Sequence, residues 1–252
     1  MQIDLGGDTA VVTGAAQGNG LAIARGLASA GAAVALLDLD GDRAEAAARA
    51  IEAEGGRAFA HTLNVADMAA CREAAAMVER ELGPTSILVN NAGVLFREAL
   101  DSERFEETWR TTLGVNVDGC MNMVRAFLPQ LRSNHGSRIV NVGSIASFIA
   151  AGTATAYVTS KGAVLQMTKA LSIDLAADGI RVNGIAPGRI ITRMTEAHRD
   201  DPEVKAAYFS RAPLGRYGET EDLVGPVLFL VSSLSQYVTG AMLPVDGGFL
   251  AA

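Results

Sequence analysis

The sequence alternates short runs of β-branched and apolar residues with longer alanine-rich stretches, and this alternation restricts the fold more than any other feature. The short runs have the length and composition of strands and lie at 9–14, 32–38, 58–65, 86–91, 137–144, 180–187 and 241–248. Between the first six runs, helices are expected at 18–30, 41–54, 67–82, 103–133 and 156–178. Strands that alternate with helices form a parallel sheet with helices on both faces. The sequence therefore predicts an α/β, doubly wound fold.

The chain has 252 residues, of which 49% are hydrophobic, and this is enough to bury one large core. No composition shift, repeat or low-complexity tract marks a boundary, so we expect a single domain over 1–252. Two stretches without charge, 139–160 and 223–245, are interrupted by Gly, Ser, Thr and Asn or Gln. They are expected to be buried segments and not membrane spans.

Charge and cysteine content exclude several classes of function. The net charge of −7 disfavours nucleic acid and anionic membranes as partners. Cys71 and Cys120 lie far apart without metal-ligand spacing, which suits core packing in a reducing compartment, and we expect no metal site. The N-terminal MQIDLGGDTA lacks the basic start and apolar run of a signal peptide, so a cytoplasmic location is expected.

Polar or turn-forming residues stand where several predicted strands end, at Asp38, Asn64, Asn90, Ser144 and 187–188. Parallel sheets bind their ligands beyond the C-terminal ends of the strands. A purely structural role would scatter such residues, so their clustering indicates a binding site.

A glycine-rich turn, "TGAAQGNG" at 13–20, follows the first strand. Gly14, Gly18 and Gly20 permit a tight turn and bring backbone N–H groups and a helix N-terminus close to a pyrophosphate. Such a turn is weak evidence by itself, because an ordinary strand–helix connection also uses glycine.

Asp38 ends the second predicted strand, 24 residues after Gly14. A carboxylate at this place can accept hydrogen bonds from both ribose hydroxyls of an adenosine and would repel a 2′-phosphate, which favours NAD over NADP. The alternative is that Asp38 caps the next helix, a role that Asp40 can also fill.

Tyr157 and Lys161 lie four residues apart in "AYVTSKGAV", so they share one helical face without other charges. Packing of the aromatic ring is the alternative to a catalytic role. A tyrosine has a pKa of about 10 in water, and a nearby cation stabilises the phenolate and lowers that pKa. The pair therefore predicts a phenol adjusted for proton transfer.

Together these features resemble the short-chain dehydrogenase/reductases. "TGAAQGNG", "NNAG" at 90–93, Asn116, Ser144, "YVTSK" at 157–161 and "PGRIIT" at 187–192 occur in the order and spacing of that family, and the resemblance extends through the terminal "VDGG". It implies a seven-stranded Rossmann-type sheet in one dinucleotide-binding and catalytic domain, an NAD cofactor and a homotetramer or dimer.

The resemblance also implies roles for individual residues. Asn64 would approach the adenine, Asn90, Ala92 and Gly93 would follow the adenosine side, and Ile190 and Thr192 would hold the nicotinamide carboxamide. Asn19 and Asn64 depart from the residues usual in the family. The full set of expected cofactor-binding residues is Gly14, Gln17, Gly18, Asn19, Gly20, Asp38, Asn64, Val65, Asn90, Ala92, Gly93, Tyr157, Lys161, Pro187, Gly188, Ile190 and Thr192.

Four residues are expected to catalyse hydride transfer between the cofactor and a secondary alcohol or ketone. Tyr157 would be the acid–base group, because removing hydride from a carbinol carbon requires removing the hydroxyl proton. Ser144 would orient the substrate oxygen, and Lys161 would lower the tyrosine pKa and bind the nicotinamide ribose. By resemblance, Asn116 would hold a water of the proton relay.

The substrate walls are expected at 94–97, 145–153 and the lid-like stretch 189–216, whose charges are mostly those of a solvated surface. We expect an NAD-linked dehydrogenase of polyols or sugar alcohols. One alternative is an NADPH-dependent β-ketoacyl carrier-protein reductase, but Asn134 and Asp178 stand where that group has basic residues. A non-catalytic nucleotide-binding protein is the other alternative, and it would not need the intact set of four catalytic residues.

Overall fold

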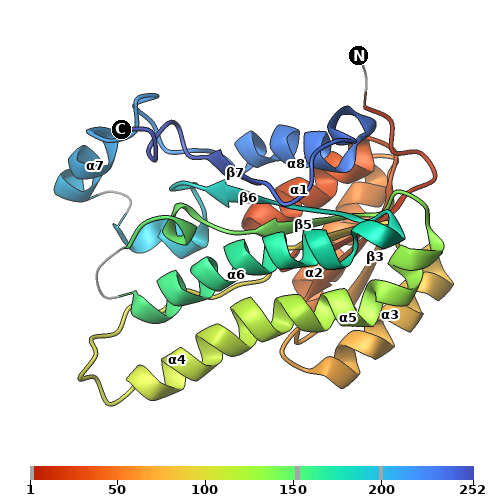
Figure 1. The fold of residues 1–252 in the computed structure, drawn as a ribbon, viewed down its shortest axis with the longest axis horizontal. Helices are drawn as coiled ribbons and strands as arrows, with labels where there is room; N and C mark the ends of the chain where they lie inside the picture. The colour runs from red at the N-terminus through yellow and green to blue at the C-terminus, as the bar shows by residue number, and fades with distance from the viewer. Residues whose placement is uncertain (1–2, 151–153, 199–200) are drawn as a thin grey trace.

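The computed structural model describes residues 3–150, 154–198 and 201–252. One parallel sheet of seven strands in the order β3-β2-β1-β4-β5-β6-β7 forms the centre of the molecule, which confirms the predicted fold class. The strands are β1 (Thr9–Thr13), β2 (Ala33–Asp38), β3 (Arg57–Thr62), β4 (Ile87–Asn90), β5 (Arg138–Val142), β6 (Arg181–Pro187) and β7 (Met242–Val245) (Figure 1).

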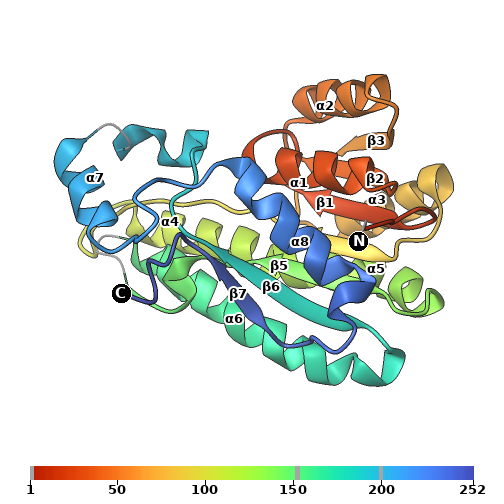
Figure 2. The same ribbon diagram turned by 90° about the horizontal axis from the view of Figure 1, so that it is seen from above.

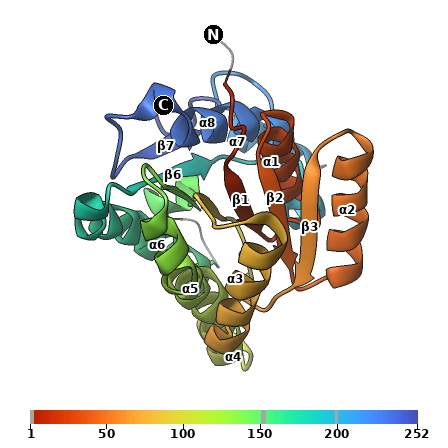
Figure 3. The same cartoon turned by 90° about the vertical axis from the view of Figure 1, so that its right-hand side faces the viewer.

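Helices cover both faces of the sheet, as Figure 3 shows end-on. One apolar core lies between the sheet and α1 (Gly18–Ser29), α2 (Gly41–Ala53) and α8 (Val224–Val231). The other core lies beneath α3 (Met68–Leu82), α5 (Gly119–Ser133) and α6 (Thr155–Asp174). The central strands are apolar on both sides because both of their faces are covered.

The predicted strands are confirmed, although five of them end one to three residues earlier than predicted. β3 ends at Thr62, β5 at Val142 and β7 at Val245, so Asn64, Ser144 and Asp246 lie in the loops that follow. In the loop after β7, Gly247 and Gly248 have φ of 66° and 87°, a left-handed conformation that ends strand geometry.

The helix expected over 103–133 is interrupted. It consists of α4 (Phe105–Leu113), a π-helical turn at Gly114–Asp118 and α5. Asn116 lies in the π turn, and insertions of this kind are frequent at functional sites. The helical pattern of the sequence does not show this interruption.

Residues 189–216 contain a 3₁₀ segment at Arg193–His198 and α7 (Pro202–Phe209). Tyr208 of α7 packs with Tyr217 and Phe249, which holds this segment close to the C-terminus, at one end of the molecule in Figures 1 and 2. Across the described residues, no helix combines the length and apolarity needed to cross a bilayer.

Candidate active site

The strand order reverses between β1 and β4, and the residues expected to bind a ligand gather around the C-terminal ends of these strands and of β5 and β6. An open parallel sheet forms a crevice at such a reversal, because the connections on its two sides run in opposite directions. The glycine loop follows β1, "NNAG" follows β4, and Ser144 follows β5.

The glycine loop is too close to its neighbours for side chains. A Cβ on Gly20 would lie 2.1 Å from the carbonyl oxygen of Gly14, and one on Gly14 would lie 3.0 Å from the Cα of Ala92. Gly14 and Gly18 also have positive φ, 63° and 56°. The three predicted glycines therefore shape the loop at the start of α1.

Thr13 and Asn91 fix this loop to β4, and sequence analysis did not identify either residue. Thr13 Oγ1 accepts hydrogen bonds from the backbone N–H groups of Asn91 and Ala92, both at 3.0 Å. Asn91 Nδ2 donates to the carbonyls of Thr13 at 2.9 Å and of Gly14 at 3.0 Å. The position of Thr13 at a strand end, directly before the first glycine, was the signal available in the sequence.

At the adenosine end of the crevice, Asp38 faces an open hollow of about 610 Å³ lined by Asp38, Leu39, Asp40, Gly41, Asp42 and Thr62. The Asp38 carboxylate accepts hydrogen bonds from the N–H groups of Ala16 at 2.9 Å and Asp40 at 3.0 Å. Asp40 caps α2 by accepting from the N–H of Arg43 at 3.2 Å. Asp40, and not Asp38, therefore caps α2.

The other expected residues of this end have mostly local partners. Gln17 Oε1 accepts from the guanidinium of Arg43, which also pairs with Asp40 at 3.3 Å. Asn64 is exposed and accepts from the N–H of Ala66 at 3.0 Å. Val65 and Asn19 complete the set: Val65 is buried, and Asn19 Oδ1 is buried without a hydrogen-bond partner in the described part of the chain.

At the catalytic end, Tyr157 and Lys161 lie on one face of α6, as predicted. The Tyr157 hydroxyl forms a hydrogen bond with the side chain of Ser144. Lys161 Nζ lies 5.7 Å from the centre of the Tyr157 ring and donates to the carbonyl of Val142 at 2.8 Å. Lys161 is only 5% exposed, so its charge is almost completely removed from water.

Burial changes the acidity of both groups. It raises the pKa of Tyr157, while the hydrogen bond from Ser144 and the charge of Arg97 act in the opposite direction. Burial also lowers the pKa of Lys161, to about 8. Ser144 and Arg97 are thus the groups that lower the pKa of Tyr157 here, and the expected effect of Lys161 on that pKa stays a prediction.

Asn116 connects the loop after β4 to α6. Its Oδ1 accepts from the N–H of Val94 at 2.8 Å, and its Nδ2 donates to the Val94 carbonyl at 3.0 Å and to Ser160 Oγ at 2.9 Å. Both amide protons are therefore used. The side chain therefore connects the π turn to the loop after β4 and to α6.

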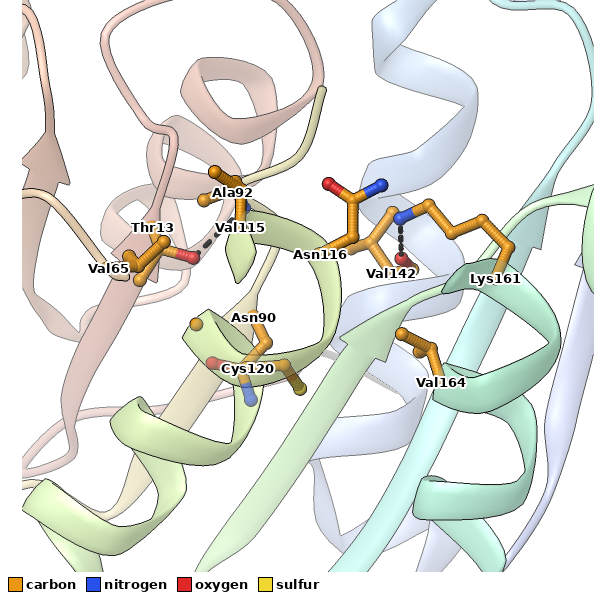
Figure 4. Close-up of a pocket in the computed structure, with 11 residues that line it drawn as sticks. Thr13, Val65, Asn90, Ala92, Val115, Asn116, Cys120, Val142, Lys161 and Val164 are labelled. Atoms are coloured by element: carbon orange, nitrogen blue, oxygen red, sulfur yellow. Dashed lines mark hydrogen bonds between the residues drawn. The ribbon is translucent and has the colours of Figure 1, made fainter. Parts of the chain in front are cut away.

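A small cavity of about 10 Å³ lies beneath Lys161 (Figure 4). Asn90 lines it and donates from Nδ2 to Asn141 Oδ1 at 2.9 Å. The Asn90 side chain therefore points into the interior, and its expected place along the adenosine side of a cofactor stays a prediction. The cavity is lined by Thr13, Val65, Asn90, Ala92, Val115, Asn116, Gly119, Cys120, Val142, Lys161 and Val164.

The loop after β6 forms the opposite wall of the crevice. A Cβ on Gly18 would lie 3.5 Å from Thr192 Cγ2, so Thr192 faces the glycine loop. Ile190 forms an isolated parallel β-bridge with Gly218. A Cβ on Gly188 would lie 2.6 Å from the hydroxyl of Tyr208, so a side chain at position 188 would clash. Pro187 ends β6. Residues 151–153 and 199–200 of the expected substrate walls lie outside the described residues.

These residues fit a nicotinamide dinucleotide. The side-chain-free glycine loop leaves backbone N–H groups for a pyrophosphate, and the hollow at Asp38 has room for an adenosine. A Cβ on Gly93 would lie 3.6 Å from Lys161 Nζ, so this glycine keeps the approach to the lysine open. Within the described residues, no group of three or more His, Cys, Asp or Glu side chains could hold a metal ion.

Comparison with known proteins agrees with this geometry. Residues 14–250 match a family model described as enoyl-(acyl carrier protein) reductase. The chain is 41% identical to galactitol 2-dehydrogenase (L-tagatose-forming) of Cereibacter sphaeroides over 97% of this chain and 96% of the relative. The chain belongs to the short-chain dehydrogenase/reductase family.

Two further relatives of this short-chain dehydrogenase/reductase are similar over nearly their whole length. The 5-keto-D-gluconate 5-reductase of Escherichia coli (strain K12) is 36% identical over 98% of this chain and 97% of its own. A crystal structure of a gluconate 5-dehydrogenase from Burkholderia cenocepacia J2315, in complex with NADP and tartrate, has a TM-score of 0.95 and 37% identity, and covers 100% of this chain and 98% of its own.

Proposed function

We propose that the protein catalyses the reversible NAD-linked oxidation of a secondary alcohol in a polyol or sugar acid. The observation that carries this proposal is the hydrogen-bonded pair of Tyr157 and Ser144 beside a buried Lys161, at the C-terminal edge of a parallel sheet. A nicotinamide cofactor, when bound, accepts or supplies the hydride. The galactitol and gluconate enzymes among the relatives support the substrate class.

Tyr157 is the proton-transfer group of this proposal. In oxidation, the Tyr157 phenolate takes the proton of the substrate hydroxyl, and in reduction the phenol returns it to the carbonyl oxygen. Ser144 orients that oxygen, since its hydroxyl already hydrogen-bonds to the phenol. Because burial raises the pKa of Tyr157, the phenolate requires the Ser144 hydrogen bond and the Arg97 charge.

Lys161 and Asn116 support this group. The bond to the Val142 carbonyl uses one of the three N–H donors of Lys161, which leaves donors for the hydroxyls of the nicotinamide ribose. The cavity bordered by Lys161 and Asn116 has room for about one water molecule, as a proton relay between the lysine and solvent requires.

The charge distribution favours NAD. Asp38, Asp40 and Asp42 line the adenosine hollow, so a 2′-phosphate would meet three carboxylates. The guanidinium of Arg43 is paired with Asp40 and Gln17. The gluconate 5-dehydrogenase of Burkholderia cenocepacia was crystallised with NADP, so the preference of this protein has to be measured in assays with both cofactors.

Arg97 favours a sugar acid over a neutral polyol. Its charge lowers the pKa of Tyr157, and it belongs to 94–97, one of the expected substrate walls. A carboxylate at the far end of the same substrate would be attracted to this cation. A carrier-protein reductase is less well supported, because Arg132 at the end of α5 is paired with Asp178 at 2.8 Å and presents less free positive charge.

We also propose that the enzyme forms a homotetramer or dimer. Phe229, Leu234, Tyr237 and Leu243 expose large apolar surfaces on α8, the segment after it and the edge strand β7. An apolar edge strand is a liability in a monomer and is stable when covered. Light scattering at micromolar concentration measures the oligomeric state.

The experiment is a matched pair of substrates, D-gluconate and D-glucitol, which have the same carbon chain with and without a carboxylate, assayed with NAD and with NADP. We expect turnover of gluconate with a KM at least about tenfold lower than that of glucitol. Replacing Arg97 by Gln should remove this difference, whereas Arg104→Gln, which affects a surface pair with Glu98, should preserve it. No turnover of any sugar acid, polyol or corresponding ketone with either cofactor would refute the proposed function.

A further inference from the structure

We propose that Asn122 is a positioning residue for the adenosine half of the cofactor. Its side chain reaches from α5 to the loop 63–67, which follows β3 and contains Asn64 and Val65, two of the residues expected to bind the cofactor. The proposal rests on the nicotinamide cofactor of the proposed function, but on no particular substrate.

A hydrogen bond between residues 57 positions apart in the chain joins α5 to this loop. Asn122 Nδ2 donates to the carbonyl of Val65 at 3.0 Å. A carbonyl can only accept, so the nitrogen of the amide, and not its oxygen, faces Val65. The thiol of Cys71 also donates to this carbonyl, at 3.5 Å, but a thiol is a weak donor. Asn122 therefore supplies the stronger of the two bonds.

The other hydrogen bonds of the loop shape it or hold its ends. Asn64 accepts from the N–H of Ala66 through its side chain and from the N–H of Asp67 through its carbonyl, both at 3.0 Å. These bonds join residues of one turn, which can move as a unit. The N–H of Leu63 donates to the carbonyl of Asp38 at 2.7 Å, and Asp67 caps α3. The bond from Asn122 thus holds the middle of the loop.

Val65 is packed closely against the start of α5. A Cβ on Gly119 would lie 2.6 Å from Val65 Cγ2 and 3.1 Å from Val65 Cβ, and Val65 is only 7% exposed. Among residues 3–150, 154–198 and 201–252, the backbone N–H of Val65 has no hydrogen-bond acceptor. Asn122 therefore fixes a residue whose own donor is unfilled, next to the exposed Asn64.

The same stretch of helix also contacts the catalytic end of the crevice. α5 continues directly from the π turn, where Asn116 donates to the carbonyl of Val94 and to Ser160 Oγ. One continuous helical segment, 116–122, thus bonds to residues at both ends. A dinucleotide needs the two ends in register, whereas either half of it needs only one. The bond from Asn122 should therefore matter for ligands that contain adenosine.

Two variants test the proposal and one serves as control. Asn122→Leu removes the donor at similar side-chain size, and Asn122→Asp keeps the shape but places an acceptor against the carbonyl. The control is Gln130→Met, also on α5. Gln130 Nε2 donates to the carbonyl of Ala75 at 2.9 Å, and its Oε1 accepts from the N–H of Thr85 at 3.0 Å. This variant removes another amide bond between α5 and α3 but does not touch the loop.

The measurement is the dissociation constant of three ligands, determined by calorimetry at pH 7 with each variant shown to be folded. NADH contains both halves, ADP-ribose lacks the nicotinamide, and reduced nicotinamide mononucleotide lacks the adenosine. In Asn122→Leu, NADH and ADP-ribose should bind about three- to tenfold more weakly, and in Asn122→Asp more weakly still. The mononucleotide should bind as it does to the wild type, and Gln130→Met should bind all three normally.

An equal loss for the mononucleotide would overturn the proposal, because Asn122 would then be a general contact for stability. Unchanged binding of NADH and ADP-ribose would overturn it too, since the loop would not need the bond from α5. The two variants are independent, so either one suffices if the other does not fold. Failure of the proposed function is distinguishable, because these readouts need no turnover. A selective loss of adenosine-containing ligands in a protein that oxidises no sugar acid or polyol would retain the role of Asn122 and reject the substrate class.

Discussion

The two ends of the cofactor crevice are built in opposite ways. At the catalytic end, buried side chains connect distant parts of the chain, as when Asn116 donates to Ser160 and Lys161 donates to Val142. At the adenosine end, Asp38 and Asn64 accept from backbone groups two residues further along the chain, Leu39 is 72% exposed, and the bond from the N–H of Ala16 to Asp38 is the long-range contact of these side chains. One end is fixed by tertiary structure and the other largely by local turns.

This difference follows from what each end must do. Proton transfer depends on geometry held within a fraction of an ångström and on groups shielded from water, so the catalytic end is buried and braced. Binding an adenosine requires complementary donors and acceptors on an open surface. Changes in cofactor preference should therefore need few substitutions, whereas changes in the chemistry should disrupt the interior.

The largest expected effect is that of Tyr157→Phe. It removes the proton-transfer group at the buried end and retains the ring, so turnover should fall by about 10²–10⁴-fold or more. The dissociation constant of NAD, measured by titration, should stay near the wild-type value. Near-normal turnover would show that the buried end is not the centre of proton transfer.

A smaller effect is expected at the open end from Asp38→Ala. The wild type should prefer NAD by roughly 10²-fold in kcat/KM, because a 2′-phosphate would face a carboxylate, and the variant should lose most of this preference through weaker use of NAD. Asp42→Ala removes a charge from the same hollow but none of the hydrogen bonds expected to the ribose, so it should weaken the preference for NAD much less than Asp38→Ala does. Equal use of NAD and NADP by the wild type would mean that Asp38 does not select the cofactor.

The smallest expected effect is on the free energy of unfolding, and it concerns the buried charge of Lys161 at the catalytic end. Burial lowers the pKa of Lys161 to about 8, from 10.5 for a free lysine, so below pH 8 the folded protein carries the cost of a buried charge. Between these values the unfolded chain binds more protons, and the stability of the wild type should rise with pH.

Lys161→Met removes that charge. In the absence of cofactor, its free energy of unfolding at pH 7 should exceed that of the wild type by about 1–3 kcal/mol, and the difference should shrink by pH 10. Urea unfolding at both pH values measures this. A variant that is less stable than the wild type at pH 7 would show that the bond to Val142 contributes more than burial costs.

Local patterns in the chain were enough to predict the fold class, the strands and the residues that shape the glycine loop. These features follow from local physics: alternating strand and helix patterns favour a parallel sheet, and the close approach of Gly14 and Gly20 excludes side chains. The spacing of Tyr157 and Lys161 placed them on one face of α6 because helical geometry fixes that relation. The capping role of Asp40 was also within reach of sequence, since a cap involves only neighbouring residues.

The surroundings of these residues could not be predicted in the same way, because they depend on long-range contacts. Asn116 in the π turn bonds to Val94 and Ser160, and the Asn90 side chain bonds to Asn141. Burial, the Ser144 hydrogen bond and the Arg97 charge shift the pKa of Tyr157. Hydrogen bonds and desolvation act over a few ångströms in space, between residues that are tens of positions apart in the chain, and no local pattern records which of them meet.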